Sequence, residues 1–113
     1  MKVYHLKTCD TCRKAIKALQ AAGHDPELID VRADGMSAAD MDVIVKTVGW
    51  ENLLNTRSTT WRGLDDAGKG DMNEGKAVLM MGEHPTLIKR PVIMDGERVT
   101  VGWRPEQQAV WIN

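Results

Sequence analysis

The sequence has no phenylalanine, no long apolar run and almost no net charge. No apolar stretch approaches the roughly 20 residues that an α-helix needs to span a bilayer. The first residues are too few and too polar to form the apolar part of a signal peptide. A formal net charge of -1 does not favour binding to nucleic acid or to an anionic membrane. We therefore expect a cytoplasmic protein with no membrane partner and no direct nucleic-acid partner.

Cysteine is also scarce, with 2 residues in a chain of 113. Without an export signal, two cysteines argue against a disulfide-stabilised scaffold and favour redox or metal chemistry. The length is typical of one domain, and a hydrophobic fraction of 42% is enough for a core. We expect a single domain over residues 1–113 that acts as a monomer.

The N-terminal part of the chain follows the order strand, helix, strand. Residues 2–6 are rich in strand-forming side chains, and residues 10–22 carry apolar side chains at helical spacing before Gly23. Residues 27–31 are again typical of a strand. This order and these lengths predict a parallel βαβ unit.

Two helices are predicted in the middle of the chain. Ser37 is suited to cap the first, which ends at Gly49. The second follows a glycine-rich loop at residues 68–70, with Asp71 as the predicted cap and Gly82 as the predicted end. The middle of the chain is therefore expected to be helical.

The C-terminal part returns to strands. Residues 91–94 and 99–101 are typical of strands joined by the hairpin turn Asp95-Gly96, and Pro105 opens a last helix. The whole order predicts an α/β protein with a thioredoxin-like fold. Its helical insertion, at about residues 37–85, separates an N-terminal βαβ unit from a C-terminal ββα unit.

Cys9 and Cys12 lie at the predicted start of the first helix, and Arg13 and Lys14 follow them directly. This spacing places the two sulfurs within about one helical turn of each other. Unpaired backbone N–H groups and the positive end of the helix dipole favour a thiolate at Cys9. Cys9 is therefore predicted to be the attacking sulfur and Cys12 its resolving partner.

Three other interpretations of this pair stay open. A structural zinc site needs about four ligands, but His5, His24 and His84 do not form a second ligand pair, so no metal site is expected. In the second interpretation, the two cysteines are simply small buried apolar residues, as free cysteine often is. In the third interpretation only Cys9 reacts, and Cys12 is a bystander in the helix.

Arginine residues form a second candidate feature. A helix N-terminus that favours a thiolate also binds oxyanions, and forked guanidinium groups bind tetrahedral oxyanions better than lysines do. Arg13 lies beside the cysteines, whereas Arg57, Arg90 and Arg104 flank turns or prolines. These four arginines are candidates for an anion site; for each of them taken singly, a solvated surface charge is the alternative. Because Pro91 opens the strand after the insertion, its bond to Arg90 is also a candidate cis peptide.

Four stretches of the sequence carry a resemblance to a known family. They are residues 4–5 (YH), 9–15 (CDTCRKA), 53–61 (LLNTRSTTW) and 84–93 (HPTLIKRPVI). Together they resemble the ArsC family, which contains arsenate reductases, the Spx regulators and small glutathione-linked reductases. The stretch at 84–93 is the most specific of the four, and the resemblance implies a thioredoxin-like fold.

The resemblance also implies a mechanism. Cys9 would attack the As(V) atom of arsenate, and a thiol of Cys12 or of glutathione would then release arsenite, as in arsenic detoxification. Arg90 and Arg104 match arginines with which the family holds the oxyanion. His5 matches a histidine that favours the thiolate of the family's nucleophile; a structural hydrogen bond is the alternative role for it.

Three places depart from the pattern of the glutaredoxin-linked arsenate reductases. Leu6-Lys7 stands where those enzymes have Asn-Pro, and Cys12 stands where they have serine. Asn55 replaces an arginine of the middle loop, for which Arg57 is the nearest substitute. With Cys12 present, the resolving step is expected to be intramolecular and linked to thioredoxin. The other expected electron donor is glutathione with glutaredoxin, and no tightly bound cofactor is expected.

Two further functions fit the same family. One is a general glutathione-dependent thiol or disulfide reductase without specificity for arsenate. The other is an Spx-type regulator, in which Cys9 and Cys12 form a redox switch and the protein binds RNA polymerase. The Tyr4-His5 pair favours the enzyme, because the regulators lack this histidine. We therefore expect an arsenate-reductase-like enzyme.

Overall fold

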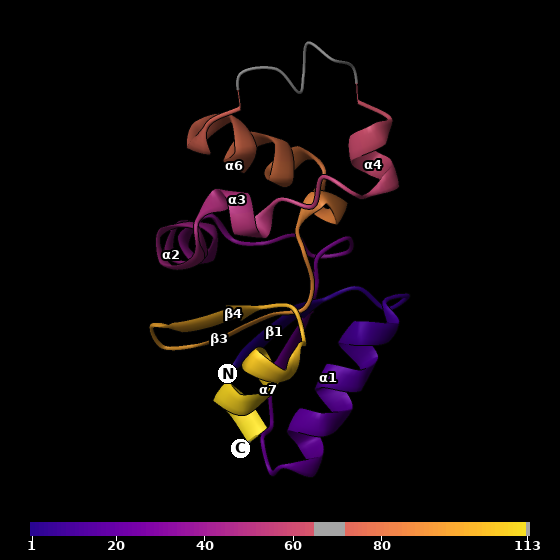
Figure 1. Cartoon of the computed structure of the whole chain (residues 1–113), viewed down its shortest axis with the longest axis vertical. Coiled ribbons are helices and arrows are strands. Elements are labelled where there is room, and N and C mark those ends of the chain that lie inside the picture. Colours follow the sequence, from indigo (N-terminus) through magenta and orange to yellow (C-terminus); the bar gives the residue numbers. More distant parts are fainter. Residues whose placement is uncertain (65–71, 113) are drawn as a thin grey trace.

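The computed structural model describes residues 1–64 and 72–112 of the chain. A four-stranded mixed sheet lies at its centre, with strand order β2-β1-β3-β4 (Figure 1). β1 is parallel to β2 and antiparallel to β3, which is antiparallel to β4. The strands are β1 (Lys2–His5), β2 (Glu27–Asp30), β3 (Val92–Asp95) and β4 (Arg98–Val101). This arrangement confirms the expected α/β fold, with a βαβ unit followed by a ββα unit.

Helices cover the sheet in two groups. α1 and α7 lie together on one side, and the helices inserted between β2 and β3 lie on the other (Figure 1). None of the helices in residues 1–64 and 72–112 is long and apolar enough to cross a membrane. The helices are α1 (Asp10–Ala21), α2 (Ala38–Val48), α3 (Trp50–Leu53), α4 (Thr59–Arg62), α6 (Glu74–Glu83), the 3₁₀ turn η1 (Pro85–Leu87) and α7 (Pro105–Ile112).

Alternation along β1 explains why the sheet has a core on each face. Successive strand side chains point to opposite sides. Val3 packs with Leu19, Ile93 and Trp111 under α1 and α7. Tyr4 points the other way and joins the larger cluster formed with the inserted helices. Both faces of β1 are therefore buried, which fixes the strand that carries the cysteine loop.

The two long inserted helices begin at side-chain caps. The Ser37 hydroxyl accepts a hydrogen bond from the Asp40 N–H, and α2 ends before Gly49, as the sequence predicts. The prediction for α6 was wrong at its start: Asn73 is the cap, because its side chain accepts from the Lys76 N–H. The predicted loop at residues 68–70 and the predicted cap Asp71 lie outside the described residues.

Candidate active site

Cys9 lies between the end of β1 and the start of α1. Its N–H donates to the Leu6 carbonyl at 3.0 Å, which closes a tight turn. Its half-buried sulfur caps the helix, 3.3 Å from the backbone nitrogen of Cys12. A backbone N–H and the positive end of α1 therefore both face this sulfur, an arrangement that stabilises negative charge there.

Cys12 has a different environment one turn later. Its side chain is fully buried. Burial, together with a hydrogen bond to Cys9, raises the pKa of the Cys12 thiol to about 12, although the charge of Arg90 works in the opposite direction. The two cysteines, both reduced in this structure, therefore differ in accessibility.

His5 ends β1 beside Asp30 at the end of β2, and both side chains are buried. The charge of His5 contributes to lowering the pKa of the Asp30 carboxyl. A catalytic role for His5 stays a prediction. Across residues 1–64 and 72–112, no three His, Cys, Asp or Glu side chains gather in a way that would hold a metal ion.

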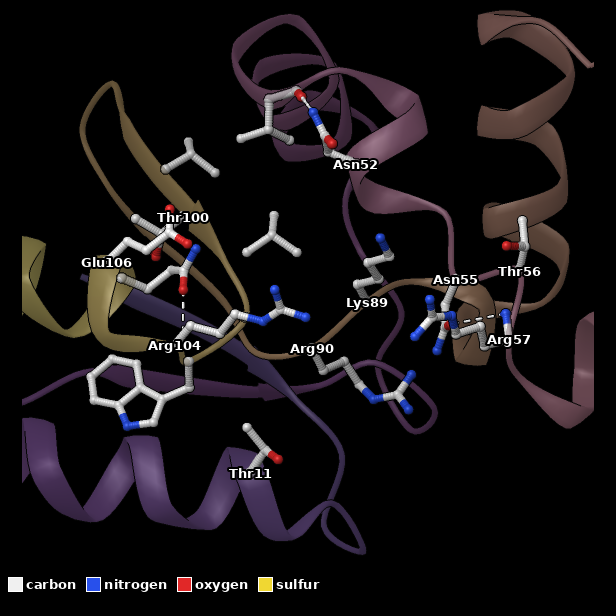
Figure 2. Close-up of a pocket in the computed structure, with 16 residues that line it drawn as sticks. Thr11, Asn52, Asn55, Thr56, Arg57, Lys89, Arg90, Thr100, Arg104 and Glu106 are labelled. Carbon is white, nitrogen blue, oxygen red and sulfur yellow. Dashed lines mark hydrogen bonds between the residues drawn. The ribbon is translucent and has the colours of Figure 1, made fainter.

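A cavity of about 1100 Å³ lies beside the start of α1, between β4 and the segment that follows α2. Arg57, Arg90 and Arg104 all line it. In Figure 2, Arg57 and Arg104 reach in from opposite sides and Arg90 lies between them. Thr11 extends the lining to the first turn of α1. Three of the four predicted anion-binding arginines are thus brought together next to the cysteine helix.

Two chain segments held side by side bring Arg57 close to Arg90. The Lys89 N–H donates to the Leu53 carbonyl at 2.8 Å, and the Asn55 N–H donates to the Leu87 carbonyl at 2.7 Å. The Asn55 side chain then accepts from the Arg57 N–H at 3.1 Å. Asn55 therefore shapes the turn that presents Arg57.

Arg90 is fixed within its own loop. One terminal nitrogen, Nη1, donates to the carbonyls of Thr86 at 3.0 Å and Ile88 at 2.8 Å. Its Nε is buried and has no hydrogen-bond partner among the described residues. The following bond to Pro91 is cis, as the sequence suggested. A buried guanidinium donor thus stays unused beside the cavity.

Arg104 is placed by the turn after β4. Gly102 has a φ of 92°, a value that L side chains rarely adopt, and its N–H donates to the Pro91 carbonyl at 2.9 Å. The Arg104 N–H then donates to the Gln107 side chain at 2.8 Å, at the start of α7. The exposed Arg104 side chain is left free to point across the cavity (Figure 2).

Arg13 has other partners. Its Nε donates to the Lys7 carbonyl at 3.0 Å, and its Nη1 forms an ion pair with Asp10 at 2.9 Å. It is not part of the cavity lining. The structure therefore does not bring Arg13 together with the other three arginines, and its role as an anion ligand stays a prediction.

Lys89 and Glu106 also line the cavity but were not predicted from the sequence. Lys89 adds a fourth cation, and Glu106 places a carboxylate on the side of Arg104 (Figure 2). Lys89 was identifiable in principle, because it precedes Arg90 in the specific stretch at residues 84–93. Glu106 gave no signal, since an acidic residue in the first turn of a helix is common.

Comparison with known proteins places this chain in a family. The ArsC family model matches residues 4–110. The solved YffB protein is 35% identical, covers 99% of this chain and 98% of its own, and has a TM-score of 0.91. An arsenate reductase (ArsC) related protein from Brucella melitensis is 34% identical over 97% of this chain and 92% of its own, with a TM-score of 0.73.

A curated relative carries a different kind of name. The global transcriptional regulator Spx 2 of Bacillus cereus is 25% identical over 93% of this chain and 81% of its own length. Regulators and proteins related to arsenate reductase therefore share this sequence pattern. The thioredoxin-like fold and the match over nearly the full length agree with the resemblance seen in the sequence. The chain belongs to the ArsC family.

Proposed function

We propose that this protein is a thiol-dependent reductase that converts arsenate to arsenite through Cys9. The observation that carries the proposal is the convergence of Arg57, Arg90 and Arg104 on a cavity at the cysteine helix. Three guanidinium groups suit a tetrahedral oxyanion, and the sulfur at the helix start suits a nucleophile. We propose that the protein acts as a cytoplasmic monomer without a tightly bound cofactor.

The proposed reaction has two steps at sulfur. The Cys9 thiolate attacks As(V), a sulfur–arsenic bond forms, and one arsenate oxygen leaves as water after protonation. A second thiolate then attacks the Cys9 sulfur. A disulfide forms, the electron pair of the sulfur–arsenic bond passes to arsenic, and arsenite leaves as As(III). The thiols have then lost the two electrons that arsenic has gained.

The arginines would bind the anion and neutralise its negative charge, and they would not take part in forming or breaking bonds. Arg104 and Arg57 are exposed and reach into the cavity, so they suit capture and orientation of the anion. The unused Nε of Arg90 suits an oxyanion bound deeper, near Cys12, whose thiol that guanidinium already influences. His5 is proposed to support the Cys9 thiolate, and Arg13 to add positive charge beside it.

The second thiol comes either from Cys12 or from glutathione. Cys12 is one turn from Cys9 and would close an intramolecular disulfide, which thioredoxin then reduces. Its burial and raised pKa mean that it must give up a proton as it attacks. Glutathione is the alternative second thiol, because the Cys9 sulfur is accessible from outside. Glutaredoxin would then restore Cys9.

A coupled assay tests this proposal. NADPH consumption is measured with arsenate and the purified protein, once with thioredoxin and its reductase and once with glutathione, glutaredoxin and glutathione reductase. We expect arsenate-dependent turnover in one system and none for Cys9→Ser. Absence of turnover in both systems, while Cys9 still reacts with an alkylating reagent, would contradict arsenate as the substrate.

The size of the cavity favours a second candidate, reduction of glutathione mixed disulfides. Cavities for ligands of drug size measure roughly 300 to 1,000 Å³, and this one measures about 1100 Å³. One tetrahedral anion fills a small part of that volume, whereas a peptide with two carboxylates offers one group to each of the arginines on opposite sides. Release of glutathione from a glutathionylated peptide, in the absence of arsenate turnover, would select this function.

The similarity to Spx 2 supports a third candidate, a redox-switched regulator that binds RNA polymerase. In that function the Cys9–Cys12 disulfide would control binding. A pull-down with the polymerase α-subunit, using the oxidised and the reduced protein, tests it. Binding of the oxidised form alone, without turnover in either reductase system, would replace the enzyme proposal.

A further inference from the structure

Asp30 is a buried carboxylate to which the proposed chemistry gives no role. It is the last residue of β2, and 8% of its surface is exposed. One carboxylate oxygen, Oδ1, accepts from the backbone nitrogens of Arg32 at 2.9 Å and Ala33 at 3.0 Å. These bonds alone would make Asp30 a turn-forming residue between β2 and α2.

Asp30 also acts on the loop that carries the cysteines. The Lys7 N–H, two residues before Cys9, contributes to lowering the pKa of the Asp30 carboxyl. The carbonyl of the same Lys7 accepts from Arg13 Nε at 3.0 Å. The N–H of Lys7 is therefore influenced by an anion, and its carbonyl is held by a cation.

A third contact ties Asp30 to β1. The parallel register places His5 beside Asp30, and the Val31 N–H donates to the His5 carbonyl at 2.9 Å. His5 is the ionisable side chain whose charge acts on Asp30. The end of β1, the cysteine loop and the turn after β2 thus meet at one carboxylate.

The chemistry of these contacts favours a charged Asp30. The hydrogen bond from Ala33 is the largest influence, and the N–H groups of Arg32 and Lys7 add to it. Together with the nearby His5 they hold the pKa of Asp30 below its usual value, although burial works against them. A carboxylate held in this way is a rigid anchor for the backbone around it.

We propose that Asp30 is a positioning residue for the active site: it holds Lys7 and His5 so that the sulfur of Cys9 is aimed correctly at the start of α1. Arg13 completes the arrangement from the opposite side of Lys7. The inference rests on the proposed function only in taking Cys9 as the reactive sulfur. It assigns Arg13 a contact with the loop in place of a contact with substrate.

Three variants separate the parts of this proposal. Asp30→Ala removes both the acceptor oxygens and the charge, and we expect alkylation of Cys9 by iodoacetamide at pH 7 to slow by about tenfold. Asp30→Asn keeps an acceptor oxygen and should recover most of that rate. The control is Asp34→Asn, which changes an exposed acid in the same turn and should alkylate at the wild-type rate.

The His5 ring reports the loss of charge separately. The NMR signals of its imidazole, recorded at one fixed pH, should move in both Asp30 variants and stay in place in Asp34→Asn, because the side chain beside the ring has changed only in the first two. Neither measurement needs arsenate or an electron donor. A failure of the arsenate assay therefore leaves this test intact. Wild-type values for both readouts in Asp30→Ala would overturn the proposal and leave Asp30 as a turn residue.

A measurement on the wild-type protein covers the case in which the variants do not fold. During acid titration, the amide proton signals of Lys7, Arg32 and Ala33 should shift with the midpoint of the Asp30 carboxyl carbon. A Lys7 signal that does not follow this midpoint, while those of Arg32 and Ala33 do, would overturn the proposal. A shared midpoint for all three supports it.

Discussion

The backbone N–H of Cys12 faces the sulfur of Cys9 at 3.3 Å, while the thiol of Cys12 is closed to solvent. The backbone N–H of Cys12 therefore stabilises negative charge on the Cys9 sulfur, while the Cys12 sulfur itself is buried. The pair is asymmetric before any substrate binds. This asymmetry is the structural basis for assigning attack to Cys9 and resolution to Cys12.

The first prediction concerns the pH dependence of labelling. Burial, followed by the hydrogen bond to Cys9, raises the pKa of Cys12 to about 12, so this thiol stays protonated and unreactive at neutral and mildly alkaline pH. Iodoacetamide at pH 7 should add one label, at Cys9, and a second only after unfolding. Peptide mass spectrometry checks both sites. Equal labelling of the two cysteines in the folded protein would contradict the prediction.

The second prediction separates the two resolving routes. Cys12→Ser removes the internal thiol and leaves Cys9 in place. We expect thioredoxin-linked arsenate turnover to be lost, while glutathione-linked turnover persists if the second thiol comes from outside. The two coupled assays run side by side measure this. An unchanged thioredoxin-linked rate would show that Cys12 is a bystander.

The third prediction concerns the anion cavity. Arg57→Ala removes a guanidinium that lines it, and the KM for arsenate should rise by about tenfold, the equivalent of about 1.4 kcal/mol. The control Arg62→Ala removes an exposed arginine of α4 that does not line the cavity. Steady-state kinetics of both variants give the comparison. A similar KM in the two would argue against a role for Arg57 in binding.

The fourth prediction concerns the contribution of the contact between β1 and α2 to stability. Tyr4 donates its hydroxyl to the carboxylate of Asp40, which also accepts from Lys2 at 3.0 Å. Tyr4→Phe removes a partly buried hydrogen bond to a charged group and should cost about 1 to 2 kcal/mol in urea unfolding. The control Asp42→Asn breaks the exposed pair with Lys46 and should cost less than about 0.5 kcal/mol. Equal losses would contradict the prediction.

The pKa of Asp40 also predicts how the free energy of unfolding depends on pH in acid. Burial alone would raise the pKa of Asp40, but the hydrogen bonds from Tyr4 and Lys2 outweigh it, so the pKa is lowered. A lowered pKa in the folded state stabilises the fold above the unfolded value of about 3.9. This stabilisation is lost as the pH falls through the folded value. Asp40→Asn should therefore flatten the acid limb of a stability–pH curve, and an unaltered limb would count against this contribution.

The fifth prediction concerns the turn that places Arg104. Gly102 has a φ of 92° with open space where a Cβ would lie, so Gly102→Ala should destabilise through the backbone alone, by about 1 to 2 kcal/mol. Gly82, near the end of α6, also has open space but no such φ. Gly82→Ala should therefore stabilise by up to about 1 kcal/mol. Thermal unfolding of both variants tests the opposite signs.

The sequence predicted the features that depend on local spacing. Cys9 and Cys12 were placed at a helix start because a strand, a turn and a capped helix follow one another within a few residues. The order of the elements along the chain and the helical insertion followed from the alternation of strand and helix patterns. The sequence predicts Asp71 as the cap of α6, whereas the structure has Asn73. Both residue types are good caps, and their spacing from the helix does not show which of the two is used.

Features that depend on contacts between distant segments were harder to predict. The closeness of Arg57 to Arg90 depends on pairing between residues 53–55 and residues 87–89, which no local pattern shows. Arg13 adjoins the cysteines in sequence, yet Lys7 and Asp10 hold its side chain. Asp30 was overlooked, although a charged residue between Ile29 and Val31 at the end of an apolar strand was a usable signal.

The position of the insertion has a consequence for how this protein diversifies. The reactive sulfurs come from the first βα unit, whereas Arg57 belongs to the inserted segment and Arg104 follows the last strand. On the proposed function, changes in those later segments would alter which anion is recognised and leave the proposed nucleophile Cys9 in place. The proposed thiol chemistry and the proposed ligand choice would then reside in separate segments of one small chain, and exchanging the insertion between relatives should change specificity while the reactive centre stays the same.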